Sequence, residues 1–181
     1  MRFLKSFKNF KDEIELALIQ NGGVEIELYS IIANLIRDSE NGCKISLRDV
    51  SSRRKTKISS RYCPSGRFPD FVVLEREKVP EPEIFGCIEI KRSVKPLKEE
   101  DLKEEIEIYK EDFKKIIYTN GISWKFYGFD NDSNNKIVLG KMKKDGNIDW
   151  EDDNWDRLED DNWNKLLEKL NNIKWDDKII E

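Results

Sequence analysis

The sequence predicts an α/β fold with a central mixed β-sheet and helices on both of its faces. Two short runs rich in β-branched and aromatic residues, 68–74 and 84–91, have the character of strands. The residues between them carry two prolines and alternating charge, so the two strands are expected to form a hairpin. Apolar residues with helical spacing lie before and after this hairpin, and the helices they predict would cover the two faces of the sheet.

Helical spacing extends over 9–20, 23–39 and 98–113. Gly22 and Gly23 separate the first two segments, as expected for a break or a helix C-cap. The second segment carries an apolar stripe that is predicted to face the sheet, formed by Val24, Leu28, Ile31, Ile32, Leu35 and Ile36.

Further strands are predicted at 44–50 and on either side of the Asn120-Gly121 turn, within 115–128. A length of 181 residues suits one domain with a real core. We therefore expect a single domain, 1–181, with an N-terminal helix at 1–22 and a core at 23–128. The remainder, 129–181, is predicted to hold an edge strand at 136–142 and an acidic, tryptophan-rich helix from Trp155 to Leu170.

The composition excludes several kinds of chemistry. The chain contains no histidine, which removes histidine metal sites and catalysis by Ser-His-Asp or Cys-His groups. Its three cysteines are widely spaced, so neither a disulfide framework nor a zinc site is indicated. The net charge of −4 argues against indiscriminate binding to a polyanion. No apolar run approaches the length of a membrane span, and a cytoplasmic protein is expected.

The second strand of the hairpin places a carboxylate and an ammonium side by side. Side chains alternate faces along a strand, so Glu89 and Lys91 share one face while Ile88 and Ile90 occupy the other. Asp70 begins the partner strand and can approach Glu89. Two carboxylates and the Ile90 carbonyl form an all-oxygen ligand set that suits Mg²⁺ or Mn²⁺. Beside such an ion, Lys91 can orient a water molecule and neutralise charge developing on phosphorus.

Pro69-Asp70 followed by Glu89-Ile90-Lys91 resembles the signature of PD-(D/E)XK nucleases. The segment Thr119-Asn120-Gly121, followed by a tryptophan, is similar to one that follows the catalytic core in type I restriction-subunit nucleases. The resemblance implies a restriction-endonuclease-like core and Mg²⁺-dependent hydrolysis of phosphodiester bonds that leaves a 5′ phosphate. It also implies Asp70, Glu89 and Lys91 as catalytic residues, with Asp70, Glu89 and Ile90 holding the metal.

The family also places a glutamate on the first core helix, where it reaches the metal directly or through water. Glu25 is chosen for this role because it lies on the same side of its helix as Leu28 and Ile32. Glu27 falls nearer the helix flank and is the reserve.

Some branches of the family place Gln and Tyr one turn apart on the next helix, in contact with the site or the substrate. Here these positions are Glu105 and Tyr109. The glutamate departs from that pattern, and Tyr109 is expected to be a core residue.

A basic, serine-rich loop leads into Asp70, and further positive charge follows Lys91. Phosphate groups are bound by such Arg, Lys and Ser donors. The residues predicted to bind nucleic acid are Arg53, Arg54, Lys55, Lys57, Arg61, Arg67 and Arg92.

The expected function is therefore a metal-dependent nuclease, with DNA favoured over RNA. The alternative is a catalytically silent nuclease-like fold that acts as a binding or regulatory module, through its basic loop or its acidic C-terminal helix. A protein partner docked on that helix and a homodimer are left open. No membrane partner is expected.

Overall fold

The structure, a computed structural model, describes residues 6–52, 56–95, 97, 99–129, 135–151 and 161–176; for 99–102 and 161 it describes the backbone alone. The helices are α1 (Phe7–Asn21), α2 (Glu25–Arg37), α3 (Glu99–Asp112) and α4 (Asp161–Asn172), with short 3-10 turns η2 (Gly42–Lys44) and η3 (Ser59–Tyr62). The strands are β1 (Ile45–Asp49), β2 (Phe71–Glu75), β3 (Ile84–Ile90), β4 (Lys115–Thr119), β5 (Ser123–Tyr127), β6 (Lys136–Val138), β7 (Gly140–Met142) and β8 (Ile148–Trp150).

The central sheet is mixed. Its six strands follow the order β1-β2-β3-β4-β5-β6. Among the described strands of this sheet, β3 and β4 alone pair in parallel, and α3 forms the crossover between them. All other neighbours in this sheet pair antiparallel. The predicted hairpin is confirmed as β2 and β3, and it occupies the middle of the sheet.

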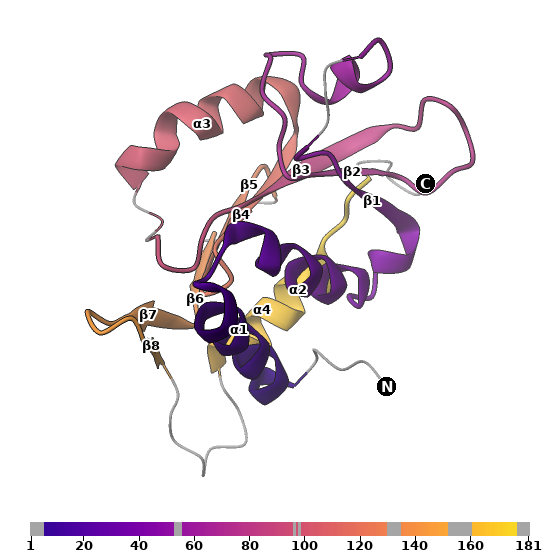
Figure 1. Cartoon of the computed structure of the whole chain (residues 1–181). Helices are drawn as coiled ribbons and strands as arrows, with labels where there is room; N and C mark the ends of the chain where they lie inside the picture. Colours follow the sequence, from indigo (N-terminus) through magenta and orange to yellow (C-terminus); the bar gives the residue numbers. More distant parts are fainter. Residues whose placement is uncertain are drawn as a thin grey trace.

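Helices cover both faces of the sheet, as predicted. Figure 1 shows α3 on one side, with α1, α2 and α4 on the other. Ile88 and Ile90 of β3 belong to the large core that includes residues of α1, α2 and α4. Cys87, on the opposite face of the same strand, packs with Tyr109 of α3. The alternation of side chains along β3 therefore points Glu89 and Lys91 toward the α3 side.

The parallel pairing of β3 with β4 depends on a glycine. A Cβ atom added at Gly86 would lie 2.2 Å from the backbone carbonyl oxygen of Lys115, its partner in β4. A backbone atom held in a ladder cannot move aside as the end of a flexible side chain can. The close pairing of β3 with β4 therefore requires a residue without a side chain at position 86.

We expect Gly86→Ala to lower the free energy of unfolding by about 3 kcal/mol, because the added methyl group must push the two strands apart. Urea denaturation measures this change. Gly22→Ala is the matched control: Gly22 has φ 63° with open space around its Cα, so only backbone strain of about 1 kcal/mol is expected. Equal destabilisation by the two variants would contradict the close approach at Gly86.

Several sequence boundaries are confirmed to within a few residues. Gly22 is the left-handed C-cap of α1, and its neighbour's amide donates to the Ala17 carbonyl. The strand predicted at 44–50 is β1, the helix at 98–113 is α3, and the turn at Asn120-Gly121 joins β4 to β5. Trp155, where the C-terminal helix was predicted to begin, lies outside the described residues, and the observed α4 begins at Asp161.

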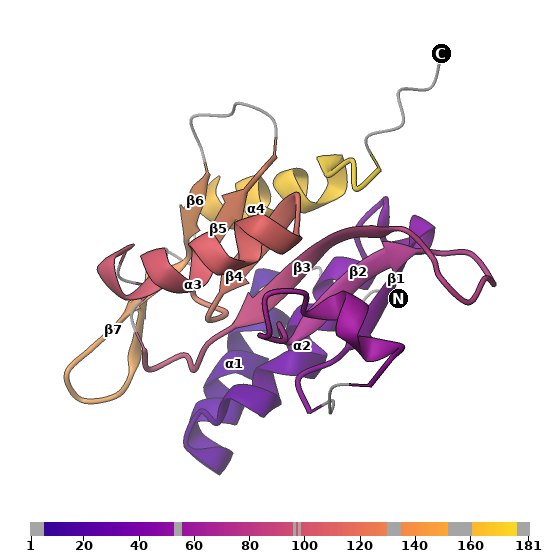
Figure 2. The ribbon, with the colours of Figure 1, turned by 90° about the horizontal axis from the view of Figure 1, so that it is seen from above.

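The edge strand predicted at 136–142 is wrong in extent. The chain bends at Leu139, whose side chain is buried and whose amide donates to Ile122. The bend divides the segment into β6, which completes the large sheet, and β7, which pairs with β8 in a separate two-stranded sheet. Figures 1 and 2 show this small hairpin projecting from the side of the molecule. Within the described ranges, each helix is too short or too polar to span a membrane.

Candidate functional site

Two acidic side chains lie opposite each other where β2 begins and β3 ends. Phe71 pairs with Ile88, so the register places Asp70, one residue earlier, opposite Glu89. The Ile90 amide donates a 2.6 Å hydrogen bond to Asp70 Oδ2. Asp70 is 7% and Glu89 5% exposed. The hairpin therefore brings together the two acids that the sequence predicted to be neighbours.

The carbonyl of Ile90 points to the same side of β3 as the Ile90 amide, toward Asp70. The amide and carbonyl groups of one residue in an extended strand point toward the same neighbour. Because the Ile90 amide faces Asp70, the Ile90 carbonyl is directed to that side as well.

Lys91 reaches two carboxylates on the α3 side of the sheet. Its Nζ lies 2.5 Å from Glu89 Oε1 and 3.1 Å from Glu105 Oε1. Burial alone would lower the pKa of Lys91, but the two carboxylates outweigh burial and raise this pKa above its ordinary value. Lys91 is therefore an ammonium group and acts as a hydrogen-bond donor.

Glu105 of α3 is a third buried carboxylate, and it is held by three donors. Tyr118 Oη donates to Glu105 Oε2 over 2.5 Å. Lys91 and Arg67 both contact Glu105 Oε1. Burial would raise the pKa of Glu105, but the Tyr118 hydrogen bond and the charges of Lys91 and Arg67 lower it below its usual value. Glu105 is therefore ionised at neutral pH.

Tyr109 is both a core residue and part of the site. It is fully buried, as expected, but its hydroxyl donates a 2.9 Å hydrogen bond to Glu89 Oε2. The expectation of a plain core residue is corrected in this respect. The contact arises because the alternation of β3 directs Glu89 to the face that α3 covers, and the sequence alone gave no distance between that helix and the strand.

The first core helix contributes Tyr29 and Glu25. Tyr29 donates to Asp70 Oδ1, and its ring packs edge-on against Phe71 with 5.3 Å between ring centroids. Sequence reasoning missed Tyr29, although it lies one helical turn after Glu25. Glu25 is half-buried, and its charge raises the pKa of Asp70. It therefore lies within electrostatic reach of the acid pair.

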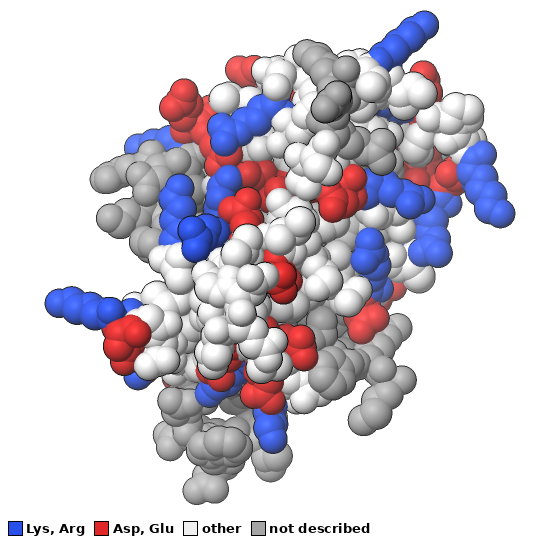
Figure 3. Space-filling view, in the orientation of Figure 1, with Lys and Arg blue, Asp and Glu red and all other residues white. Residues whose placement is uncertain are grey.

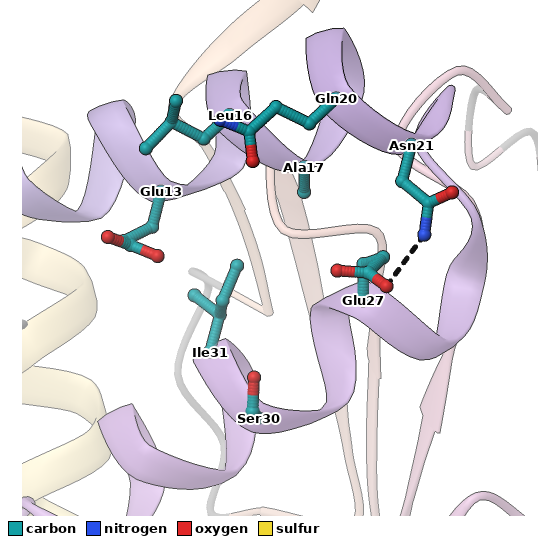
Figure 4. A pocket seen from close by; sticks show the side chains of 8 residues that line it. All are labelled: Glu13, Leu16, Ala17, Gln20, Asn21, Glu27, Ser30 and Ile31. Carbon is teal, nitrogen blue, oxygen red and sulfur yellow. Dashed lines mark hydrogen bonds between the residues drawn. The ribbon is translucent and has the colours of Figure 1, made fainter.

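Glu27, the reserve acid, faces a different part of the molecule. It lines a cavity of about 370 Å³ between α1 and α2, which Glu13, Gln20 and Ser30 also line. Figure 4 shows the Glu27 side chain turned toward Asn21, whose amide donates to it over 2.7 Å. Two positions along the helix thus direct Glu25 and Glu27 to different surroundings, as expected from 3.6 residues per turn.

The Thr119-Asn120-Gly121 turn holds the chain that follows Lys91. The Lys91 amide donates to the Thr119 carbonyl over 2.8 Å. The Asn120 side chain donates to the Lys95 carbonyl over 2.9 Å and accepts from the amide of Ser123 over 2.8 Å. This turn therefore fixes the end of β3 from the β4 side.

The basic residues are used in different ways. Lys57 is exposed, and the Arg67 side chain is 50% exposed where it contacts Glu105. Arg61 donates to the Pro82 carbonyl over 2.5 Å, and Arg92 donates to the Gly22 carbonyl over 3.2 Å. The other predicted nucleic-acid contacts, Arg53, Arg54 and Lys55, lie outside the described residues.

Charge of both signs is distributed over the surface. Figure 3 shows basic and acidic side chains interleaved on one face, with no separation into an acidic half and a basic half among the residues drawn as described. Contacts to a polyanion on that face would therefore be local ones.

Burial and the charges of neighbouring acids disfavour ionisation of Asp70 and Glu89. Burial, followed by the charge of Asp70, raises the pKa of Glu89 to about 7. Burial also raises the pKa of Asp70 to about 6, against the hydrogen bonds from Tyr29 and Ile90. Two buried carboxylates with raised pKa values are stabilised in their ionised form by a nearby cation.

The donor set fits a hard divalent cation. Asp70 and Glu89 supply two carboxylates and Ile90 a backbone carbonyl at adjoining positions of the hairpin, and Mg²⁺ is commonly bound by one or two carboxylates with water and phosphate oxygens completing its shell. Among the residues that the structure describes, no group of three or more Asp, Glu or Cys side chains forms a metal cage. Most of the coordination sphere would thus be left to water or substrate.

The metal-free protein should become less stable as the pH rises from about 4 to 7. In this range folded Asp70 and Glu89 retain protons that the unfolded chain has lost, so the unfolded state binds fewer protons and stability falls. The expected loss is on the order of 3 kcal/mol for each acid. Urea denaturation in EDTA at several pH values measures it. A Glu89→Gln variant should show a shallower pH dependence, and identical profiles for the two proteins would contradict the raised pKa values.

Comparisons with known proteins support the fold. No protein-family model and no curated protein matches the chain. One solved structure that it resembles is a DrdV–DNA complex determined by cryo-electron microscopy. The two chains share 13% identity with a TM-score of 0.53, over 78% of this chain and 89% of the other. Together with the mixed sheet and its central hairpin, this similarity confirms the restriction-endonuclease-like fold predicted from the sequence.

Proposed function

We propose that this protein is a divalent-metal-dependent nuclease of the PD-(D/E)XK type that hydrolyses phosphodiester bonds in DNA. The observation that carries the proposal is the position of Asp70 opposite Glu89, with Lys91 on the same face of β3 as Glu89. A purely structural ion pair would not need a second buried carboxylate whose charge opposes ionisation of the first.

Each residue of the site has a distinct role in this proposal. Asp70, Glu89 and the Ile90 carbonyl would hold Mg²⁺ or Mn²⁺, and Glu25 would complete the acidic cluster, directly or through water. The bound ion supplies Lewis acidity at the scissile phosphate. The Lys91 ammonium orients the attacking water and offsets charge that develops on the phosphate oxygens.

The proposed reaction is an in-line displacement. Water attacks phosphorus opposite the 3′ oxygen, and a new P–O bond forms as the water loses a proton to solvent. The bond to the 3′ oxygen breaks, and that oxygen takes up a proton from solvent to become a hydroxyl. The product strand therefore carries a 5′ phosphate. Arg67, half-exposed beside the acids, is positioned to bind a phosphate of the substrate strand, and Lys57 lies on the loop that leads to it.

DNA is the proposed substrate because the structure that this chain resembles is a complex with DNA. The serine-rich basic loop and the interleaved surface charge favour binding through local phosphate contacts, whose affinity falls with added salt.

The proposal is tested with labelled single- and double-stranded DNA and RNA, each incubated with Mg²⁺, Mn²⁺ or EDTA. The wild-type protein should cut DNA with either metal and leave it intact in EDTA. Glu89→Ala should not cut. Glu81→Ala is the matched control, because Glu81 is an exposed acid on the same hairpin and should leave cleavage unchanged.

Equal cleavage by the wild-type protein and Glu89→Ala would refute the assignment. DNA binding without cleavage, together with no Mn²⁺ binding that depends on Glu89, would support the alternative of a catalytically silent binding module.

A further inference from the structure

Glu105 makes a set of contacts that the proposed roles do not use. It lies on α3, is 7% exposed, and approaches the site from the helix layer above the sheet. One of its oxygens contacts both Lys91 and Arg67, and the other accepts the hydrogen bond from Tyr118. A single carboxylate thus holds two cations and is itself fixed by a buried tyrosine.

Lys91 also contacts Glu89, and Glu89 is the carboxylate proposed to bind the metal. Lys91 contacts Glu89 Oε1 at 2.5 Å, and Tyr109 occupies Glu89 Oε2. A divalent ion on Glu89 competes with the ammonium for the same electron pairs and repels it. Lys91 then requires an anchor that is not a metal ligand, and among the contacts of its ammonium group Glu105 is that anchor.

Tyr118 suits the task of fixing Glu105. It lies on β4, directly opposite Glu89 in the parallel register, and its ring is fully buried. Its hydroxyl therefore reaches Glu105 from a rigid strand rather than from a loop. The Lys91 ammonium also lies 5.5 Å from the centre of the Tyr118 ring, a distance at which a cation is attracted to the ring face.

We infer that Glu105, held by Tyr118, is the residue that keeps the Lys91 ammonium in its working position when a metal occupies Glu89. The inference rests on the proposed nuclease function. Glu105 and Tyr118 act through Lys91, so both are positioning residues.

The first test compares single-turnover DNA cleavage by the wild-type protein, Glu105→Gln and Tyr118→Phe. Without the Glu105 charge, Lys91 should move out of position, and a small displacement of this kind should slow DNA cleavage by Glu105→Gln by about 10- to 100-fold. Tyr118→Phe removes one hydrogen bond and should slow cleavage by about 3- to 10-fold. The double variant should be no slower than Glu105→Gln, because both changes act on the same contact.

Two measurements separate positioning from a general structural role. Mn²⁺ affinity and DNA affinity should not weaken in Glu105→Gln, so the loss should fall on the rate of the bound complex. Glu107→Gln is the matched control, since Glu107 lies on the same helix, is exposed, and pairs with exposed Lys110 at 2.7 Å. It should cleave at the wild-type rate.

The second test does not depend on activity. A double-mutant cycle of Lys91→Met and Glu105→Gln, followed by urea unfolding, reports the coupling between the two side chains. The coupling should change the unfolding equilibrium constant by about threefold or more, both in EDTA and with excess Mn²⁺. Coupling that disappears with Mn²⁺ would overturn the inference, because Lys91 would then have left Glu105 when the metal bound.

The outcomes distinguish the inference from the function on which it rests. If the wild-type protein cleaves DNA and Glu105→Gln cleaves it at a rate within about twofold of wild type, the role of Glu105 is overturned and the nuclease function stands. Absence of cleavage by the wild-type protein with both metals overturns the proposed nuclease function, and the urea cycle then decides whether Glu105 holds Lys91.

Discussion

Lys91→Met is expected to reduce the single-turnover rate of DNA cleavage by about a thousandfold, the cost of removing a donor aimed at developing negative charge. The structure gives the reason for so large an effect. The Lys91 side chain is only 14% exposed, and its raised pKa keeps it positively charged in a poorly hydrated site. Methionine fills a similar volume without the charge. Stopped reactions with a labelled duplex, at saturating protein and Mg²⁺, measure the rate.

Metal binding provides the internal control for Lys91→Met. Removal of an ammonium near Glu89 should leave Mn²⁺ affinity unchanged or higher, because one competing positive charge is gone. Lys110→Met, which removes an exposed lysine from α3, should cleave normally. Lys91→Arg should recover only part of the rate, since a planar guanidinium cannot reproduce the geometry of an ammonium. Cleavage by Lys91→Met within about tenfold of wild type would refute the assigned role.

Asp70→Asn is expected to abolish cleavage and to weaken Mn²⁺ binding by more than about 100-fold. Loss of residues that only orient a metal ligand costs about 10- to 100-fold in affinity, and Asp70 is proposed to be a ligand itself. Asparagine can keep the local hydrogen bonds, because its oxygen can accept from the Ile90 amide and its amide can donate to Tyr29. Calorimetric titration with Mn²⁺ measures the affinity.

The same Asp70→Asn variant should be more stable than the wild type in EDTA at pH 8. The substitution removes one member of a buried pair of like charges, so the pKa of Glu89 should fall toward its ordinary value. Excess Mn²⁺ should stabilise the wild-type protein and not the variant. Lower stability of Asp70→Asn at pH 8, with wild-type Mn²⁺ affinity, would show that Asp70 has a structural role instead.

The sequence predicted the central hairpin and its face assignment because both depend on local rules. Strand alternation alone places Glu89 and Lys91 on one face and Ile88 and Ile90 on the other, and the structure confirms this arrangement. The glycines at 22 and 23 likewise marked the end of α1, because a left-handed C-cap favours glycine. The division of the 136–142 segment into two strands at Leu139 was not predicted, because it depends on a hydrogen bond from the Leu139 amide to Ile122 in another part of the chain.

What only the tertiary structure decided is the set of groups around the two acids. Tyr29 reaches Asp70 from α2, while Tyr109 and Glu105 reach Glu89 and Lys91 from α3. These contacts depend on how helices pack on the sheet, at separations of up to 41 residues, and the periodicity of a strand or helix does not fix that packing. The sequence by itself determined which residues could form a metal-binding edge, because periodicity fixes the direction of each side chain. The packing of α2 and α3 decided how buried that edge is, and burial is the main cause of the raised pKa values of Asp70 and Glu89.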